Sequence, residues 1–280
     1  MGASPARRLW AAVEPLHAVV YFAPETAEAA KAAGLRGYWM GYFAGRLAPL
    51  GEVGPAAATS MLFGFAPEMV TRALPDAWSF ASPAEVVRSR LDAVSAALRR
   101  VLGPDGPQEL AALLSRAAKA CGCDGRPLAA GWAAVPQPPG SWSRLWLAAT
   151  VLREHRGDGH VLAAVHAGLS GLETTLTHIG DGVIGRGDVQ PHRGWSDKAW
   201  TTAVQRLRHR GLLDDEGRLT AAGTALRHRI EEDTDRLAAA PVEELGNDLE
   251  RLLELAEPLS RALFDSGVVP APNPMGVSRP

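Results

Sequence analysis

The chain has 280 residues, of which 46% are hydrophobic, and a formal net charge of −2 at pH 7. This apolar content excludes a chain that is disordered throughout, and the near-neutral charge argues against strong non-specific binding to nucleic acid. No apolar run reaches the roughly 18 residues that cross a bilayer, and the first residues lack a signal-peptide core, so we expect a cytoplasmic protein without membrane contact.

Helical periodicity dominates residues 1–121, which we expect to form an N-terminal helical domain. Residues 82–102 give the clearest helix, because Ser82 stands at the N-cap position, Pro83 follows at the first helical position, and apolar residues then recur along one face. Residues 122–141 are rich in Gly and Pro and predict a linker between two domains.

The second domain is expected over residues 142–265, and it begins with a helical hairpin. Residues 142–155 and 160–179 have helical periodicity, and the sequence Arg-Gly-Asp-Gly at 156–159 separates them. Since glycine weakens helices, we expect the chain to break at this point and a new helix to begin at His160.

Residues 180–220 have the order of a winged helix-turn-helix. A short helix leads to a turn at 193–194, a longer helix covers 196–210, and two short apolar strands flank an acidic turn. An amphipathic helix at 241–265 follows, and residues 266–280 lack periodicity and predict a disordered tail. The expected fold class is therefore mainly α, with an N-terminal helical region and a C-terminal winged helix-turn-helix that has a small β-wing.

Five segments of the chain form a distinctive set: LHAVVYFAPE at 16–25, GLRGYWMGYFAGRLAPLG at 34–51, FAPEMVTRALPDAW at 65–78, LREHRGDGH at 152–160 and GWSDKAWTTAVQRLRHRGLLD at 194–214. Together they resemble an actinobacterial family that is labelled helix-turn-helix or MarR-like. The resemblance implies a homodimer, formed by the helix at 241–265, with a winged helix that binds DNA and a pocket that senses a small molecule. The family label supplies no activity, and Leu147 stands where relatives are expected to carry a histidine.

The longer helix of the winged region offers side chains of the types that reach base edges or phosphates. These candidate DNA-binding residues are Lys198, Thr201, Thr202, Gln205, Arg206 and Arg208. The wing, however, carries Asp214, Asp215 and Glu216 with only Arg218 to offset them, and carboxylates beside phosphates cost affinity. Two interpretations stay open: a winged helix that retains DNA binding, and one that serves as a scaffold or dimer element.

The stretch 152–160 supplies the candidate catalytic residues. The positive end of a helix dipole would keep His160 neutral, which is the form of imidazole that accepts a proton, and Asp158 would fix its tautomer. The simpler interpretation is a solvated helix terminus in which Asp158 is only a cap.

Polar side chains inside apolar runs predict a lined pocket next to this stretch. His17, Tyr21 and Glu25 follow the i, i+4, i+8 spacing of one helical face, and His17 or Glu25 is a second candidate for proton transfer. We expect arginines to hold an anionic or carbonyl group of the ligand and tyrosines to form walls with hydroxyl handles. The predicted ligand-binding residues are Arg46, Arg156, Tyr21, Tyr38, Tyr42, Glu154 and His155.

Metals and nucleotide cofactors find little support in the sequence. His155, Asp158 and His160 are ligand types that iron or zinc accepts, but they lie on both sides of the expected helix break, so we expect no metal. The sequence has no glycine-rich phosphate loop after a strand and no Ser nucleophile elbow, so we expect no nucleotide cofactor and no Ser hydrolase chemistry.

The function favoured by these residues is a small-molecule-binding protein on a winged-helix scaffold. Its chemistry would be that of a cofactor-independent acid–base enzyme of specialised metabolism, of the lyase, isomerase or cyclase type. The alternative is a MarR-like, ligand-responsive transcriptional regulator that binds DNA. A DNA-repair or drug-sequestering protein is a third and weaker hypothesis.

Overall fold

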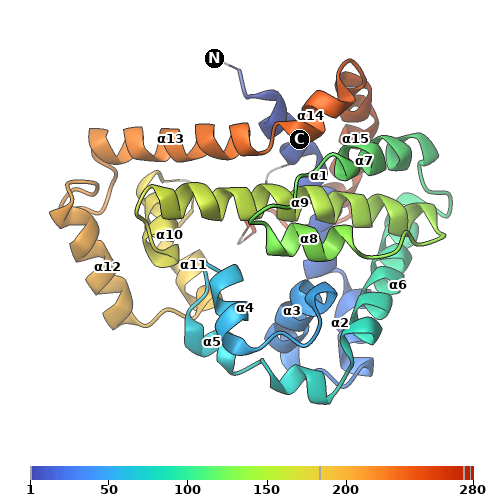
Figure 1. Cartoon of the computed structure of the whole chain (residues 1–280), viewed down its shortest axis with the longest axis horizontal. Coiled ribbons are helices and arrows are strands. Elements are labelled where there is room, and N and C mark those ends of the chain that lie inside the picture. The colour runs from blue at the N-terminus through green and yellow to red at the C-terminus, as the bar shows by residue number, and fades with distance from the viewer. Residues whose placement is uncertain (1, 183, 274, 278) are drawn as a thin grey trace.

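A computed structural model describes residues 2–182, 184–273, 275–277 and 279–280 (Figure 1). These residues form fifteen α-helices and two short 3-10 helices without a β-strand, so the mainly α fold is confirmed. The N-terminal half contains α1 (Pro5–Phe22), α2 (Pro24–Ala32), α3 (Gly37–Leu47), η1 (Ala48–Leu50), α4 (Pro55–Met61), α5 (Pro67–Thr71), η2 (Asp76–Ser79), α6 (Pro83–Leu102), α7 (Gln108–Lys119) and α8 (Pro127–Ala133). The C-terminal half contains α9 (Ser141–His166), α10 (Gly171–Gly180), α11 (Arg186–Arg193), α12 (Asp197–His209), α13 (Ala221–Leu237), α14 (Ala240–Leu245) and α15 (Asp248–Asp265).

Helix α9 crosses the middle of the molecule, and α1, α6, α7, α8 and α13 all pack against it (Figure 1). Its first three turns, from Trp142 to Leu152, are buried on nearly every side because these helices surround it. A helix that is apolar all round is stable only in such a position. Neither α9 nor any other helix in the described part of the chain is long and apolar enough to cross a membrane.

The apolar core consists of three clusters, and α9 connects the first to the third. The first joins α1, α6, α7, α9 and α15 around Trp142 and Trp146. The second joins α3, α4 and α5 around Phe43 and Phe65, and the third joins α10, α12 and α13 to the end of α9 around Trp200. The charged stretch 152–160 lies on α9 between these clusters and is largely buried, so the interpretation of a solvated helix terminus is wrong.

The predicted break at residues 156–159 is also wrong, because α9 continues through it without interruption. Each glycine inside a helix costs about 1 kcal/mol, and the packing of α8, α10 and α13 against this part of α9 outweighs that cost. A small residue is needed at Gly159, since a Cβ there would lie 2.9 Å from Nη1 of Arg126. That nitrogen donates a hydrogen bond to the carbonyl oxygen of His155. His160 therefore lies inside a helix and not at its start.

Two segments that the sequence predicts to be irregular are packed. The expected linker at 122–141 contains α8, which buries Leu128 and Trp132 against its neighbours. In the expected tail, Val269 and Val277 are buried, whereas positions 274 and 278 lie outside the described residues. The linker prediction depends on Gly and Pro content and the tail prediction on missing periodicity, and neither signal reports the apolar side chains that anchor a segment.

The amphipathic region 241–265 forms α14 and α15, and the apolar face of α15 packs against α1, α6 and α7 of the same chain. Leu252, Ala256 and Leu263 on this face are fully buried. The surface on which the homodimer prediction depends is therefore already covered within one chain.

Helices α11 and α12, joined by a tight turn, form the helix-turn-helix, and α10 packs against α12. The turn is at Gly194, whose φ of 72° lies in the left-handed region that favours glycine. A Cβ at this position would also lie 2.9 Å from the sulfur of Met69. Ser196 caps α12, because its hydroxyl accepts the backbone N–H of Ala199.

The expected β-wing is not formed in the described residues, which place a turn there, closed by one antiparallel bridge between Leu213 and Leu219. The carboxylate of Asp214 accepts the backbone N–H groups of Glu216 and Arg218. These two bonds hold the turn in a compact shape, which leaves too few extended residues for a strand pair.

Candidate functional site

Helix α12 presents a polar face to solvent at one edge of the molecule (Figure 1). Its opposite face is anchored by Trp200, Ala203 and Leu207, which are buried in the third cluster. Lys198 and Gln205 are exposed. A helix fixed in this way and open on its other side has the geometry that a recognition helix needs to enter the major groove.

The six predicted DNA-binding residues differ in whether their side chains already have hydrogen-bond or ion-pair partners within the protein. Lys198, Thr201 and Gln205 are exposed, and their side chains have no hydrogen-bond or ion-pair partner in the described part of the chain. Arg206 donates to the carboxylate of Glu173 on α10, and Arg208 donates to backbone carbonyls of the wing turn. The Thr202 hydroxyl donates within α12, to the carbonyl oxygen of Lys198. The free side chains therefore come from one stripe of α12.

The helix-turn-helix is also the basic part of an otherwise acidic chain. Residues 185–210 contain six Arg or Lys and two Asp, although the whole chain has a net charge of −2. The wing turn has the opposite character, because Asp215 and Glu216 are exposed and Arg218 is paired with Glu216. Favourable contacts with phosphates are thus expected at α11 and α12, and not at the wing.

A cavity of about 300 Å³, which we call the central cavity, lies between α9, α10, α11 and residues 61–65. Its polar lining includes Arg46, Arg193, Glu154, Asp158, His160 and His178. Its apolar lining comes mainly from residues 61–65 and from Leu128 and Val161. It lies next to the stretch 152–160, where the sequence predicts a pocket.

Glu154 is the centre of a buried ion-pair network beside the central cavity. Its carboxylate accepts two hydrogen bonds from Arg46, at 3.0 Å from Nε and 2.6 Å from Nη2, and one from Arg153 at 2.8 Å. Burial raises the pKa of Glu154, but the two guanidinium groups outweigh burial and hold this pKa at about 2. Arg46 is therefore fully engaged and would have to leave Glu154 to bind a ligand.

Three predicted ligand-binding tyrosines line a second cavity of about 420 Å³, which we call the tyrosine cavity. Tyr21, Tyr38 and Tyr42 form one wall, and Arg90 from α6 reaches the same space. The Arg90 guanidinium lies 5.7 Å from the ring centre of Tyr21, and its Nε has no hydrogen-bond partner in the described residues. The single pocket expected from the sequence is therefore two cavities.

The remaining predicted site residues lie outside both cavities. Arg156 pairs with Asp235 of α13 at 2.7 Å, and His155 is buried on a different side of α9. His17 is a core residue with both ring nitrogens satisfied, at 3.0 Å from the hydroxyl of Thr150 and 3.0 Å from that of Tyr21. Glu25 pairs with an arginine at the surface. Glu25 leaves the face of His17 because α1 ends at Phe22 and α2 begins at Pro24.

Asp158 and His160 both line the central cavity, but they do not contact each other. The Asp158 carboxylate accepts the backbone N–H of Ala129 at 3.0 Å and so caps α8, while Nδ1 of His160 lies 3.1 Å from the hydroxyl of Thr234. Burial raises the pKa of Asp158 to about 6 and lowers that of His160 to about 4. The histidine is neutral at pH 7, because of burial and not because of a helix dipole.

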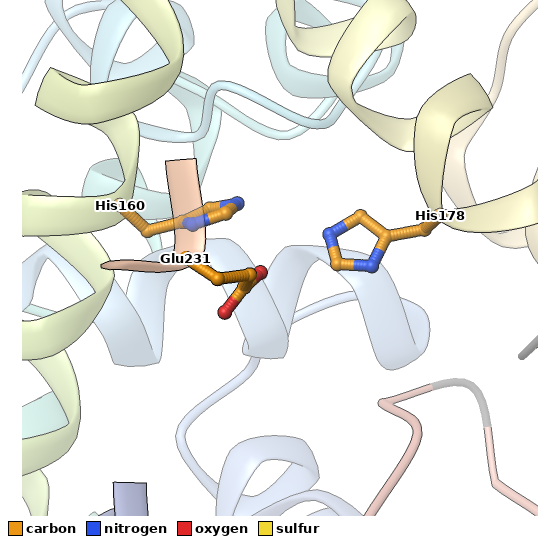
Figure 2. Close-up of side chains that lie close together, drawn as sticks. All are labelled: His160, His178 and Glu231. Carbon is orange, nitrogen blue, oxygen red and sulfur yellow. The ribbon is translucent and has the colours of Figure 1, made fainter. Parts of the chain in front are cut away.

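The described residues bring together a set of potential metal ligands that the sequence did not suggest. Figure 2 shows His160 and His178 pointing toward each other from α9 and α10, with Glu231 of α13 beside them, and the ligand atoms lie within 4.8 Å of one another. However, Glu231 already pairs with Arg7, with Arg227 at 2.7 Å and with Arg156 at 3.7 Å. Three guanidinium groups would repel a divalent cation, so these side chains do not fit a metal.

The three ligands considered from the sequence do not converge, because α9 is continuous. His155, Asp158 and His160 point to different partners around the helix: the side of Arg126, the N-terminus of α8, and Thr234 of α13. Asp158 is three residues after His155, and His160 is two residues after Asp158. On an unbroken helix this spacing does not place all three side chains on one face.

Acidification is expected to destabilise the protein through the histidines at the central cavity. Burial lowers the pKa of His160 to about 4 and that of His178 to about 3, against an ordinary value of 6.5. As the pH falls below 6.5, the unfolded chain takes up protons that the folded chain refuses, so unfolding becomes more favourable. Each histidine adds at most about 1.4 kcal/mol per pH unit to this loss, which urea denaturation between pH 7 and pH 5 measures.

The variant His178→Asn is expected to reduce the pH dependence of stability by about one proton in this range. His228→Asn makes the same change at an exposed position of α13 and is the matched control. Equal slopes for the two variants would show that His178 is accessible to protons in the folded chain.

Sequence reasoning missed Arg90, Arg193, His178 and Glu231. A signal for Arg90 exists, since it stands four residues from both Val86 and Val94 and so falls inside the apolar stripe of its helix. The other three give no such signal: the packing of α9, α10 and α11 brings Arg193 and His178 to the central cavity, and α13 brings Glu231 next to His160 and His178.

Helices α10, α11 and α12, with the left-handed turn at Gly194 and the exposed polar face of α12, define a helix-turn-helix protein. Comparison with known proteins agrees: residues 6–270 match a helix-turn-helix family, and the chain belongs to that family. No curated protein and no solved structure matches the chain. The family match covers the N-terminal helices as well as the helix-turn-helix.

Proposed function

We propose that the protein is a DNA-binding helix-turn-helix regulator in which α12 is the recognition helix. The observation that carries this proposal is the free polar stripe of Lys198, Thr201 and Gln205 on a helix whose other face is buried. Gln reads adenine through two hydrogen bonds, Thr contacts base edges or thymine methyl groups, and Lys contacts phosphates or guanine. The basic balance of residues 185–210 and the family membership support the same function.

The finer proposal is a MarR-like regulator that responds to a small molecule. The central cavity supports it, because Val189 and Arg193 of α11 line that cavity and connect it directly to the helix-turn-helix. The homodimer expected from the sequence stays a prediction, and its interface would have to lie elsewhere than on the apolar face of α15.

The variant Lys198→Gln tests whether α12 meets DNA. Lys198 stands in the first turn of α12 and is exposed, so its loss is expected to weaken binding to a labelled duplex of mixed sequence by about threefold to tenfold. Loss of one phosphate contact should also reduce the salt dependence of the affinity by about one unit of slope. Fluorescence anisotropy at several salt concentrations measures both quantities.

Lys119→Gln is the matched control, because it makes the same change at an exposed position of α7, far from α12. The control should bind DNA as the unaltered protein does. If both variants weaken binding equally, or if the protein shows no salt-dependent binding, α12 is not a DNA-binding helix.

A second candidate function, the cofactor-independent acid–base enzyme of specialised metabolism, is favoured by Asp158. This carboxyl lines the central cavity, and burial raises its pKa to about 6, close to the value that a general base requires near neutral pH. His160 is less suited to this role, because a pKa of about 4 makes it a weak base. In the enzyme α12 would be only a scaffold, and Lys198→Gln would behave like its control.

A further inference from the structure

Arg193, the last residue of α11, brings a positive charge to the central cavity without a compensating carboxylate. It forms no ion pair with any described residue, and its guanidinium lies 4.4 Å from the ring centre of Phe65. Burial lowers its pKa, whereas the other two arginines of the lining, Arg46 and Arg153, are both paired with Glu154. Arg193 is half-buried, and among the described residues it makes a side-chain hydrogen bond to Tyr42 but pairs with no carboxylate, so a negatively charged group of a ligand beside it would be stabilising.

The backbone on each side of Arg193 is fixed to the N-terminal region. The carbonyl oxygen of Arg193 accepts the N–H of Ala66 at 2.8 Å, and the indole nitrogen of Trp195 donates to the carbonyl of Gly64 at 3.0 Å. These bonds anchor the main chain on each side of Arg193 to residues 64–66, of which Gly64 and Phe65 themselves line the cavity.

The other residues that line the central cavity indicate the chemical character of the uncharged part of the ligand. Leu62, Phe63, Phe65 and Val161 provide apolar and aromatic surface, which suits an organic body better than an inorganic ion. The hydroxyl of Thr174 is buried in the same cavity and has no hydrogen-bond partner in the described residues, so a second polar group of a ligand could satisfy it.

We propose that the central cavity binds a small organic anion whose charged group pairs with Arg193 and whose apolar or aromatic body rests against Phe63 and Phe65. Arg193 immediately precedes the turn at Gly194, so an ion pair at its guanidinium acts on the segment that orients α12. If the protein is the DNA-binding regulator proposed above, occupancy of the cavity changes its affinity for DNA.

Isothermal titration calorimetry of the full chain with 2-naphthoate and with 2-naphthamide tests the site. The two probes share one shape and differ in charge, and a charge-assisted hydrogen bond is worth about 1.5–3 kcal/mol, so the carboxylate should bind about tenfold or more tightly. Inorganic phosphate is the third probe, and it should bind more weakly than naphthoate because it cannot use the aromatic wall. Equal binding of naphthoate and naphthamide, binding of neither, or tighter binding of phosphate would overturn the proposal.

Two variants assign the effect to named groups. Arg193→Gln should reduce the affinity for naphthoate about tenfold and leave that for naphthamide unchanged, whereas Arg186→Gln, at an exposed position of the same helix, should alter neither. Thr174→Val should weaken both probes or neither, since its hydroxyl does not recognise charge. If Arg193→Gln still binds naphthoate more tightly than naphthamide, the carboxylate binds to a group other than Arg193.

The DNA arm separates this inference from the proposed function. Saturating naphthoate should shift the affinity for the mixed-sequence duplex in the unaltered protein and not in Arg193→Gln. If the protein binds no DNA but naphthoate binds through Arg193, the proposed function fails and the anion site stands. If DNA binds and naphthoate does not, the anion site alone is refuted.

Discussion

Replacing Glu154 by glutamine is expected to lower the free energy of unfolding by about 3–5 kcal/mol. The side chain of Glu154 is 1% exposed, and it neutralises both Arg46 and Arg153. Gln keeps the shape but removes the charge, so two guanidinium groups are left in a poorly solvated place without a full counterion. Urea denaturation at pH 7, followed by far-UV circular dichroism, measures the change.

The surface pair Arg8–Glu250 provides the control, because both side chains are largely exposed. Glu250→Gln should leave the urea midpoint unchanged within error, as exposed pairs contribute little. Adding Arg46→Met to Glu154→Gln should recover part of the loss, since Arg46 would otherwise be left without an ion-pair partner in the described residues, whereas Arg153 keeps Glu14. If Glu154→Gln is no more harmful than Glu250→Gln, the network around Glu154 is not buried as described.

Substitution of Gly171 by alanine is expected to cause the second large loss of stability. A Cβ at this position would lie 1.6 Å from the carbonyl oxygen of Phe63 and 2.6 Å from its carbonyl carbon. Overpacking of this kind costs about 1–3 kcal/mol, and the upper end is expected because the opposing atoms are main-chain atoms that cannot rotate away. Thermal and urea denaturation would both register the change.

Gly171→Ala should also disturb the central cavity, because residues 61–65 and α10 form two of its walls. The matched control is Gly187→Ala, at an exposed helical position of α11 where a Cβ would meet nothing within 4 Å. Alanine should be neutral or slightly stabilising there, since it favours helix over glycine. A Gly171→Ala protein as stable as the control would show that α10 does not pack closely on Phe63.

Local sequence signals predict the elements that local interactions define. Ser82 and Pro83 mark the start of α6, and Gly194 with Ser196 marks the turn and the start of α12, as the structure confirms. In each case a cap or a glycine conformation within a few residues determines the boundary. The helix-turn-helix could therefore be located from the sequence.

Elements that depend on distant packing are not predictable in this way. The glycines at 157 and 159 predict a helix end, yet α9 continues because several helices enclose it. Asp158 is recognised as a cap, but the helix that it caps is α8, almost thirty residues earlier in the chain. The local sequence pattern indicates that Asp158 can cap a helix, but the tertiary packing determines which helix it caps.

The location of the central cavity was predictable from the sequence, and so was part of its lining. The stretch 152–160 does line a cavity, and Arg46, Glu154, Asp158 and His160 are among its residues. Arg156 points to α13 instead, because successive residues of an unbroken helix face different directions. Arg193 stayed hidden because nothing in its own segment indicates that the turn at Gly194 rests against residues 64–66.

In-vitro selection from a randomised duplex library tests most directly the central claim that α12 reads DNA. At moderate salt the unaltered protein should enrich one motif, and Gln205→Ala should relax the preference at one position of that motif by about 1–3 kcal/mol in binding free energy. Arg251→Ala, at an exposed position of α15, should enrich the same motif as the unaltered protein. Two results would contradict the claim. The unaltered protein enriches no motif, or the variants Gln205→Ala and Thr201→Ala each enrich the same motif as the unaltered protein.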